Sequence, residues 1–148
     1  ERPLKKGEFK KASAEVEVQF GTNFLADGDV LFRRDQELIL SRKEVDHFDL
    51  PAKNYTLGLP YGKLLKDGSV RMSDELATAR GSHASDHVVE VDDEQLQYLL
   101  SGKDMNTNSD RAGDVILRWN EMNLGIGLLR DGKVKNKLAR WLVAHRQQ

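Results

Sequence analysis

Hydrophobic and polar residues alternate near the start of the chain. Between residues 14 and 20, Val16, Val18 and Phe20 are separated by charged or amide side chains. A period of two places these three side chains on one face of an extended backbone and is typical of a half-buried strand. We therefore predict a strand over residues 14–20.

A hairpin and a short helical turn are predicted next. Apolar runs at residues 30–32 and 38–40 flank a polar break, which is the pattern of two paired strands. Ser41 is followed three residues later by Glu44, which matches a helix-capping box. Residues 50–54 contain Pro, Lys and Asn and are predicted to form a linker.

Two helices are predicted in the middle of the chain. The first begins after Ser73 and ends at Gly81, because Ser favours the N-cap and Gly the C-terminus of a helix. The second begins after Asp92 or Asp93 and ends at Gly102. Its apolar face would consist of Leu96, Leu99 and Leu100. Strands are expected at residues 55–59, 63–65 and 87–91, and a polar loop at residues 103–113.

The last third of the chain predicts a second hairpin. An apolar run over residues 114–119 and another over 124–129 are separated by a polar break, and the second run reaches Asp131-Gly132. Asp-Gly between such runs is a strong turn signal. By period two we expect Leu124, Ile126 and Leu128 to point into the core. A last helix over residues 138–145 would turn Leu138, Trp141 and Leu142 inward.

A basic cluster follows the Asp-Gly turn. Lys133, Lys135 and Lys137 alternate, so on a strand they project from one face at ~7 Å intervals, a spacing that suits the phosphates of a nucleic acid. Asn136 and Arg140 could add hydrogen bonds to RNA. The competing interpretation is an idle, solvated charge run. Trp119 and Trp141 could stack on bases, but their apolar surroundings favour core packing.

Composition is that of a globular protein, with 148 residues, 39% hydrophobic and 32% charged. No apolar run approaches the ~20 residues that a membrane span needs, so no membrane partner is expected. There is no signal-peptide pattern, and the first residue is Glu rather than Met, so we expect a fragment of a longer protein. The sequence has no Cys, which excludes disulfides and thiolate sites and favours a reducing, cytoplasmic location.

The net charge of −1 hides a strong asymmetry. Residues 128–148 carry six Lys or Arg against one Asp, and residues 1–11 carry five against two Glu. Residues 86–104 carry six acidic side chains against one Lys. A polyanionic partner would therefore meet the two ends of the chain and avoid the middle.

Three other candidate sites are weak. Gly125-Ile126-Gly127 lacks the third Gly and the following helix of a dinucleotide fingerprint. Residues 58–63 resemble a P-loop but have the wrong spacing and no Ser or Thr after the Lys. His83 and His87 have metal-ligand spacing only on a helix, which the glycine at 81 disfavours. We expect no metal site.

Several segments resemble one protein family. The closing hairpin with its Lys-Asn pair, residues 114–140, resembles the PUA-like domain at the C-terminus of bacterial RNA cytosine-5 methyltransferases of the Nol/Nop/Sun family. The strand and acidic helix start over residues 89–103, Gly58 with Tyr61-Gly62-Lys63, and residues 9–15 resemble further parts of the same region. The chain departs from the family pattern at Ala139 and at Ser73-Asp74.

The resemblance implies an α+β fold. A small strand-rich pre-PUA module over residues 1–52 would precede a PUA-like β-pseudobarrel with peripheral helices over residues 53–148. The implied parent is an S-adenosylmethionine-dependent ribosomal RNA 5-methylcytosine methyltransferase that attacks cytosine with a Cys thiolate. Because this chain has no Cys, we expect it to lack the catalytic core, to bind no cofactor itself and not to be an enzyme.

The expected role is to dock structured RNA, ribosomal RNA in particular, for the missing methyltransferase core in cis. The candidate RNA-binding residues are Lys63, Arg130, Lys133, Lys135, Asn136, Lys137 and Arg140. The alternative is a protein-interaction module that packs on the catalytic core or on a second subunit, with the basic residues serving only solubility.

Overall fold

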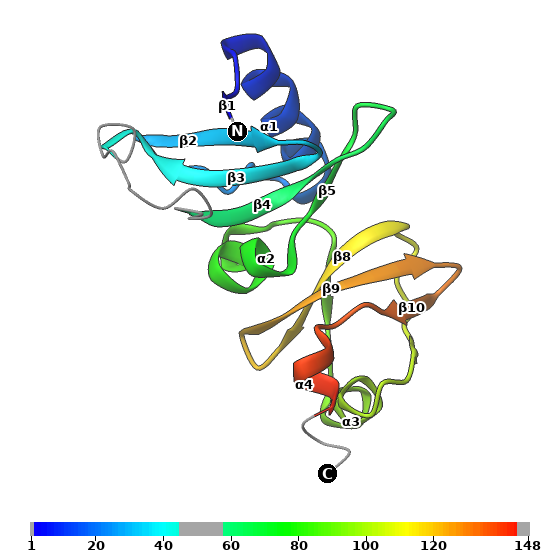
Figure 1. Cartoon of the computed structure of the whole chain (residues 1–148). Coiled ribbons are helices and arrows are strands. Elements are labelled where there is room, and N and C mark those ends of the chain that lie inside the picture. The colour runs from blue at the N-terminus through cyan, green and yellow to red at the C-terminus, as the bar shows by residue number, and fades with distance from the viewer. Residues whose placement is uncertain (1, 45–57, 145–148) are drawn as a thin grey trace.

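The chain forms two five-stranded sheets with helices packed around them (Figure 1). A computed structural model describes residues 2–44 and 58–144. In chain order the elements are β1 (Arg2–Pro3), α1 (Lys6–Phe20), β2 (Asp29–Arg34), β3 (Glu37–Arg42), β4 (Leu59–Leu64), β5 (Val70–Met72), α2 (Asp74–Arg80), a 3₁₀ turn (Gly81–His83), β6 (Val88–Glu90), α3 (Asp93–Leu100), β7 (Met105–Asn106), β8 (Gly113–Trp119), β9 (Met122–Arg130), β10 (Lys133–Asn136) and α4 (Arg140–Ala144). The predicted α+β fold class is confirmed.

The first sheet is antiparallel throughout and has the order β1-β2-β3-β4-β5. The predicted first hairpin is confirmed, because β2 pairs with β3 in register from Asp29 opposite Arg42 to Arg34 opposite Glu37. Ser41 lies inside β3, so its predicted role as a helix cap is wrong. The strand continues through Ser41, whose side chain is buried and is therefore not available to cap a helix.

The strand predicted over residues 14–20 is wrong, because these residues belong to helix α1. Val16 and Phe20 are buried, as the period-two pattern also requires, but Val18 between them is 84% exposed. Residues four apart share one face of a helix, and Ala12 extends that face by one more turn. Val16 and Phe20 therefore fit both periods, and packing on the first sheet selected the helix.

The cap-based predictions for α2 and α3 are confirmed. The Ser73 hydroxyl oxygen accepts the Leu76 N–H at 3.0 Å, and Gly81 is the C-cap of α2. Asp92 accepts the Gln95 N–H at 2.7 Å, while the Gln95 side chain accepts the Asp92 N–H at 2.9 Å. This reciprocal capping box fixes the start of α3, in the orientation that buries Leu96 and Leu99.

The second sheet has the order β6-β8-β9-β10-β7, with β6 parallel to β8 and the other pairs antiparallel. The predicted strand before α3 and the second hairpin are both confirmed. The predicted loop over residues 103–113 contains the short strand β7, which pairs with β10. Figure 1 shows α3 and α4 beside this sheet and α2 between the two sheets.

Both faces of the β8–β9 hairpin are covered. Ile116 and Ile126 belong to the core that α1, α2 and the first sheet share, whereas Leu117 and Leu129 belong to a second core beneath α3. The expectation that Leu124, Ile126 and Leu128 all point into the core is correct only for Ile126. Leu124 and Leu128 are half-buried. Leu124 packs on the second core, because the pairing register shifts opposite it between Leu117 and Arg118. Leu128 keeps the face of Ile126 but is only partly covered there.

The division predicted after residue 52 lies outside the described residues, as do the linker at 50–54 and the start of the strand predicted at 55–59. The division therefore stays a prediction. β4, which follows it in the chain, pairs with β3 in the first sheet, and β5 pairs with β4. Among residues 2–44 and 58–144, no helix is long and apolar enough to cross a membrane.

Candidate nucleic-acid interface

Lys133, Lys135 and Lys137 form an exposed stripe along and just beyond β10; we call these three residues the lysine stripe. All three are exposed, while Val134 between the first two is fully buried. Since alternate residues of a strand share a face, Lys133 and Lys135 project from the same side. The prediction that the three lysine side chains lie in solvent is confirmed.

Strand pairing places the lysine stripe on a defined face of the second sheet. Lys135 is opposite Leu128, and Leu128 is opposite Asp114. Lys133 is opposite Arg130, which is also exposed. Because directly paired residues share a face, the stripe lies with Leu128 and not with the core beneath α3. This is the face that turns toward the first sheet.

A tight turn holds Arg130 and Lys133 together. Asp131 and Gly132 both have left-handed backbone angles, with φ of 52° and 74°. Two consecutive positive φ values define the type I′ turn that two-residue hairpins favour, and Asp-Gly supplies them at low cost. The turn therefore brings Arg130 opposite Lys133 at one end of the lysine stripe.

Asn136 is engaged by its own chain. Its side-chain NH₂ donates to the Leu99 carbonyl at 2.8 Å and to the Lys103 carbonyl at 3.0 Å. Its side-chain oxygen accepts the Leu138 N–H at 3.1 Å, and its backbone N–H donates to Asp104 at 2.9 Å. These bonds fix the end of β10 against the end of α3. That Asn136 also contacts RNA stays a prediction.

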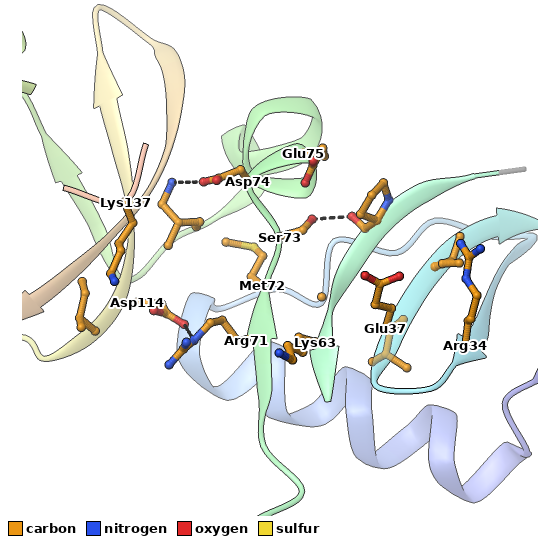
Figure 2. Close-up of a pocket in the computed structure, with 16 residues that line it drawn as sticks. Arg34, Glu37, Lys63, Arg71, Met72, Ser73, Asp74, Glu75, Asp114 and Lys137 are labelled. Atoms are coloured by element: carbon orange, nitrogen blue, oxygen red, sulfur yellow. Dashed lines mark hydrogen bonds and ion pairs between the residues drawn. The ribbon is translucent and has the colours of Figure 1, made fainter. Parts of the chain in front are cut away.

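A groove with a volume of about 630 Å³ lies between the two sheets; we call it the intersheet groove. Its lining comes from β2 to β5, from the start of α2, from β8 and β9, and from the residue after β10. It brings together two residues that the sequence analysis proposed separately, Lys63 of β4 and Lys137 of the lysine stripe. Figure 2 shows Lys137 and Asp114 on the side of the second sheet, and Lys63, Glu37 and Arg34 on the side of the first.

Charges of both signs line the intersheet groove. The basic residues are Arg34, Lys63, Arg71 and Lys137, and the acidic ones are Glu37, Asp74, Glu75 and Asp114. Arg71 lies 3.6 Å from Asp114, nitrogen to oxygen, as the dashed line in Figure 2 shows. Burial raises the pKa of Asp114, and the charges of Arg71 and Lys137 oppose that rise. Arg71 and the acidic residues were not predicted, because none stands in a basic run or a motif.

Asp74 ties α2 to the second sheet. One of its carboxylate oxygens accepts the Ile126 N–H at 2.8 Å. Burial raises the pKa of the Asp74 carboxyl, the hydrogen bond from Ile126 lowers it, and the nearby Glu75 and Asp114 raise it further. No basic group of the described residues pairs with it. Asp74 is thus a half-buried carboxylate in the groove without a compensating cation.

The C-terminal helix α4 differs from its prediction. Arg140 is exposed, and Trp141 is 75% exposed, so the expectation that Trp141 packs inward is wrong. Leu138 and Leu142 pack on the core beneath α3, as predicted. Leu138 precedes α4, and within this five-residue helix Leu142 and Val143 pack on that core while Trp141 faces away. Trp119 is half-buried and donates its indole N–H to Asp93 at 2.8 Å.

The histidine pair does not gather further ligands in the described part of the chain. His83 is the last residue of the 3₁₀ turn and His87 has a left-handed φ of 53°. Across residues 2–44 and 58–144, no group of three or more His, Cys, Asp or Glu side chains is placed to hold a metal ion.

Comparison with known proteins finds a similarity for residues 86–144. Residues 86–144 match the family model described as the methyltransferase RsmF PUA domain. They include β6 to β10, α3 and α4, the whole second sheet. Residues 86–144 are thus similar to the PUA domain of this methyltransferase. The matched region contains the lysine stripe, Arg130 and Arg140, whereas Lys63 lies before it.

Similarity to curated relatives extends beyond the matched region. The ribosomal RNA small subunit methyltransferase F of Aeromonas hydrophila is 30% identical over 142 residues, and that of Aeromonas salmonicida is 28% identical over 142 residues. Each alignment covers 95% of this chain and 29% of the relative. The enzyme of the same name from Psychromonas ingrahamii is 26% identical over 119 residues, covering 77% of this chain and 25% of the relative. The chain thus spans less than a third of the length of these relatives.

Proposed function

We propose that this chain docks structured RNA through the lysine stripe and the intersheet groove. The observation that carries the proposal is the arrangement of the three lysines. All three are exposed, Lys133 and Lys135 lie on the groove-facing side of β10, and Lys137 just beyond it lines the groove that Lys63 also lines. Ammonium groups at ~7 Å intervals match a phosphate backbone, which supplies most of the affinity in RNA binding.

The proposed contacts divide by position. Lys133, Lys135 and Lys137 would neutralise phosphates, and Arg130 would extend the stripe at the turn. Lys63 would contact the same strand from across the groove, and Arg140 would flank it on α4. Asn136 would contribute to the stability of the fold, because its side-chain hydrogen bonds hold the end of β10 in place.

The proposed context is a ribosomal RNA methyltransferase. The relatives carry that name, and this chain corresponds to less than a third of their length. We infer that the rest of such a protein supplies an S-adenosylmethionine-dependent core that methylates C5 of cytosine, and that the present residues contribute RNA affinity in cis without holding the cofactor. A cytoplasmic location follows from this role as a prediction.

A second candidate function is docking of another protein surface, either the catalytic core or a second subunit. The observation that favours it is the exposure of two large apolar side chains, Val18 on α1 and Trp141 on α4. Exposed apolar groups of this size commonly mark contact surfaces when they cluster. These two lie on helices beside different sheets, so we place this candidate second (Figure 1).

A salt titration separates the two candidates. If about three phosphates are neutralised, log affinity for a ribosomal RNA fragment should fall against log salt with a slope of roughly −2 to −3. Changing Lys133, Lys135 and Lys137 together to Glu should abolish binding and leave the fold intact, since the three side chains are exposed.

The matched control is the triple Glu variant at Lys10, Lys43 and Lys103, which has the same net charge. These lysines are exposed and do not line the groove. The control should lose far less affinity than the stripe variant. If both variants bind alike, or if affinity ignores salt, protein docking becomes the better account.

A further inference from the structure

The intersheet groove has the size and the chemistry of a small-ligand site. Its volume of about 630 Å³ lies within the range of about 300–1,000 Å³ that such sites occupy. Apolar surface comes from both sheets, through Ile39, Met72, Ile126 and Leu128. The flat face of a nucleobase can pack against such side chains, while basic groups on either side of the groove meet the sugar-phosphate backbone.

The lysine stripe leads into this groove. Lys133 and Lys135 stand outside it on β10, and Lys137 lines it. A single RNA strand whose phosphates lie on Lys133 and Lys135 can therefore reach the groove at Lys137. Lys63 lines the groove as well and is exposed, so its charge is available to a phosphate there, whereas Arg71 is paired with Asp114. A base-paired duplex would hold its bases away from the lining, whereas an unpaired nucleotide can turn its base inward.

Within the described part of the chain, one carboxylate oxygen of Asp74 remains free to accept a hydrogen bond in the groove. Its Oδ1 is held by the Ile126 N–H, which fixes the carboxylate, and among the described residues its Oδ2 makes no hydrogen bond or ion pair. An ionised carboxylate only accepts hydrogen bonds. Cytosine and adenine present an exocyclic amino donor where uracil presents a carbonyl acceptor.

We propose that the intersheet groove takes one unpaired nucleotide of single-stranded RNA, and that Asp74 selects a base with an exocyclic amino group. The base amino N–H donates to Asp74, the base face packs on the apolar lining, and the adjoining phosphates lie on Lys137 and Lys63. This inference rests on the proposed function: the lysine stripe supplies affinity for any sequence, and Asp74 adds a preference among bases.

The first test uses the unmodified chain and three short single-stranded RNAs of equal length, oligo(C), oligo(A) and oligo(U), at pH 7.5 and fixed salt. Fluorescence anisotropy should show oligo(C) and oligo(A) binding about tenfold more tightly than oligo(U), the effect of one hydrogen bond to a charged group. The slope of affinity against salt should be the same for all three, because the phosphate contacts are shared.

The second test is Asp74→Asn. The amide oxygen can still accept the Ile126 N–H, but the other position becomes an NH₂ donor, which suits the uracil carbonyl. The preference for oligo(C) should disappear or reverse, with an unchanged salt slope. Glu75→Gln is the matched control: it removes the same charge from the next residue, which is exposed and lines the groove, and it should leave the preference intact.

The outcomes separate the inference about Asp74 from the proposed function. Salt-dependent binding of all three RNAs without preference overturns the inference and leaves the proposed function standing, and this result needs no variant. A preference that Asp74→Asn does not alter also overturns it. If the unmodified chain binds neither the oligonucleotides nor a ribosomal RNA fragment, the proposed function itself is overturned.

Discussion

Asn136 is expected to matter for stability and hardly at all for RNA affinity. Replacing it by Ala removes three side-chain hydrogen bonds, to the carbonyls of Leu99 and Lys103 and from the Leu138 N–H. The Lys103 carbonyl can turn to water, and the Leu99 carbonyl keeps the N–H of Gly102 at 3.0 Å. Each of these two bonds is therefore worth only its net value of about 1 kcal/mol.

The Leu138 N–H is the costly loss, because Leu138 is buried. Leaving that N–H unpaired costs about 1–3 kcal/mol, so the three bonds together predict that Asn136→Ala lowers the free energy of unfolding by about 3–5 kcal/mol. For a domain of this size that corresponds to a fall in Tm of roughly 10–15 °C. Asn136→Asp should be at least as damaging, since a carboxylate keeps the acceptor but turns negative charge toward two carbonyl oxygens.

Urea unfolding followed by tryptophan fluorescence measures the change, with Lys135→Ala as the control. Lys135 is exposed and should cost under about 0.5 kcal/mol. Well below its Tm, Asn136→Ala should keep its RNA affinity within about twofold, because its side chain is fully used within the fold. Unchanged stability together with a tenfold loss of RNA affinity would refute this account and make Asn136 a direct RNA contact.

Three further changes test the stability of the fold. Ser73→Ala should cost about 1 kcal/mol in urea unfolding, because it removes the N-cap of α2. Gly125→Ala should cost about 1–3 kcal/mol by the same measurement: φ is 144° there, and the new Cβ would lie 3.0 Å from Asp74. Burial alone would raise the pKa of Asp29, but the hydrogen bond from Arg80, with others, leaves it below its usual value. Asp29 should therefore stabilise the fold above pH ~4 and lose this contribution as pH falls further, and Asp29→Asn should flatten that part of the pH–stability profile.

Turns and helix caps that depend only on neighbouring residues could be predicted from the sequence. The Asp131-Gly132 turn, the Ser73 cap and the start of α3 after Asp92 all formed as predicted, because each needs only residues within about four positions. The exposure of the lysine stripe was also readable, since alternate charged residues cannot share the buried face of a strand with Val134. The resemblance to a methyltransferase PUA domain rested on the order of such local signals, and the family match supports it.

Tertiary packing decided what local patterns left open. Val16 and Phe20 satisfy a period of two and a period of four equally, so only contact with the first sheet made residues 14–20 part of a helix and exposed Val18. The short helix α4 packs Leu142 and Val143 on the second core and leaves Trp141 outside, because its narrow face holds no more.

The candidate site depends most clearly on the tertiary structure. Lys63 and Lys137 lie in different sheets and meet across the intersheet groove only because α2 and Ile126 join the two sheets in a common core. Asp74 carries no motif, and its position in the groove follows from a hydrogen bond to a strand 52 residues away. A local sequence pattern predicts the conformation of each element. A site built between elements depends on long-range contacts that no short window of sequence contains.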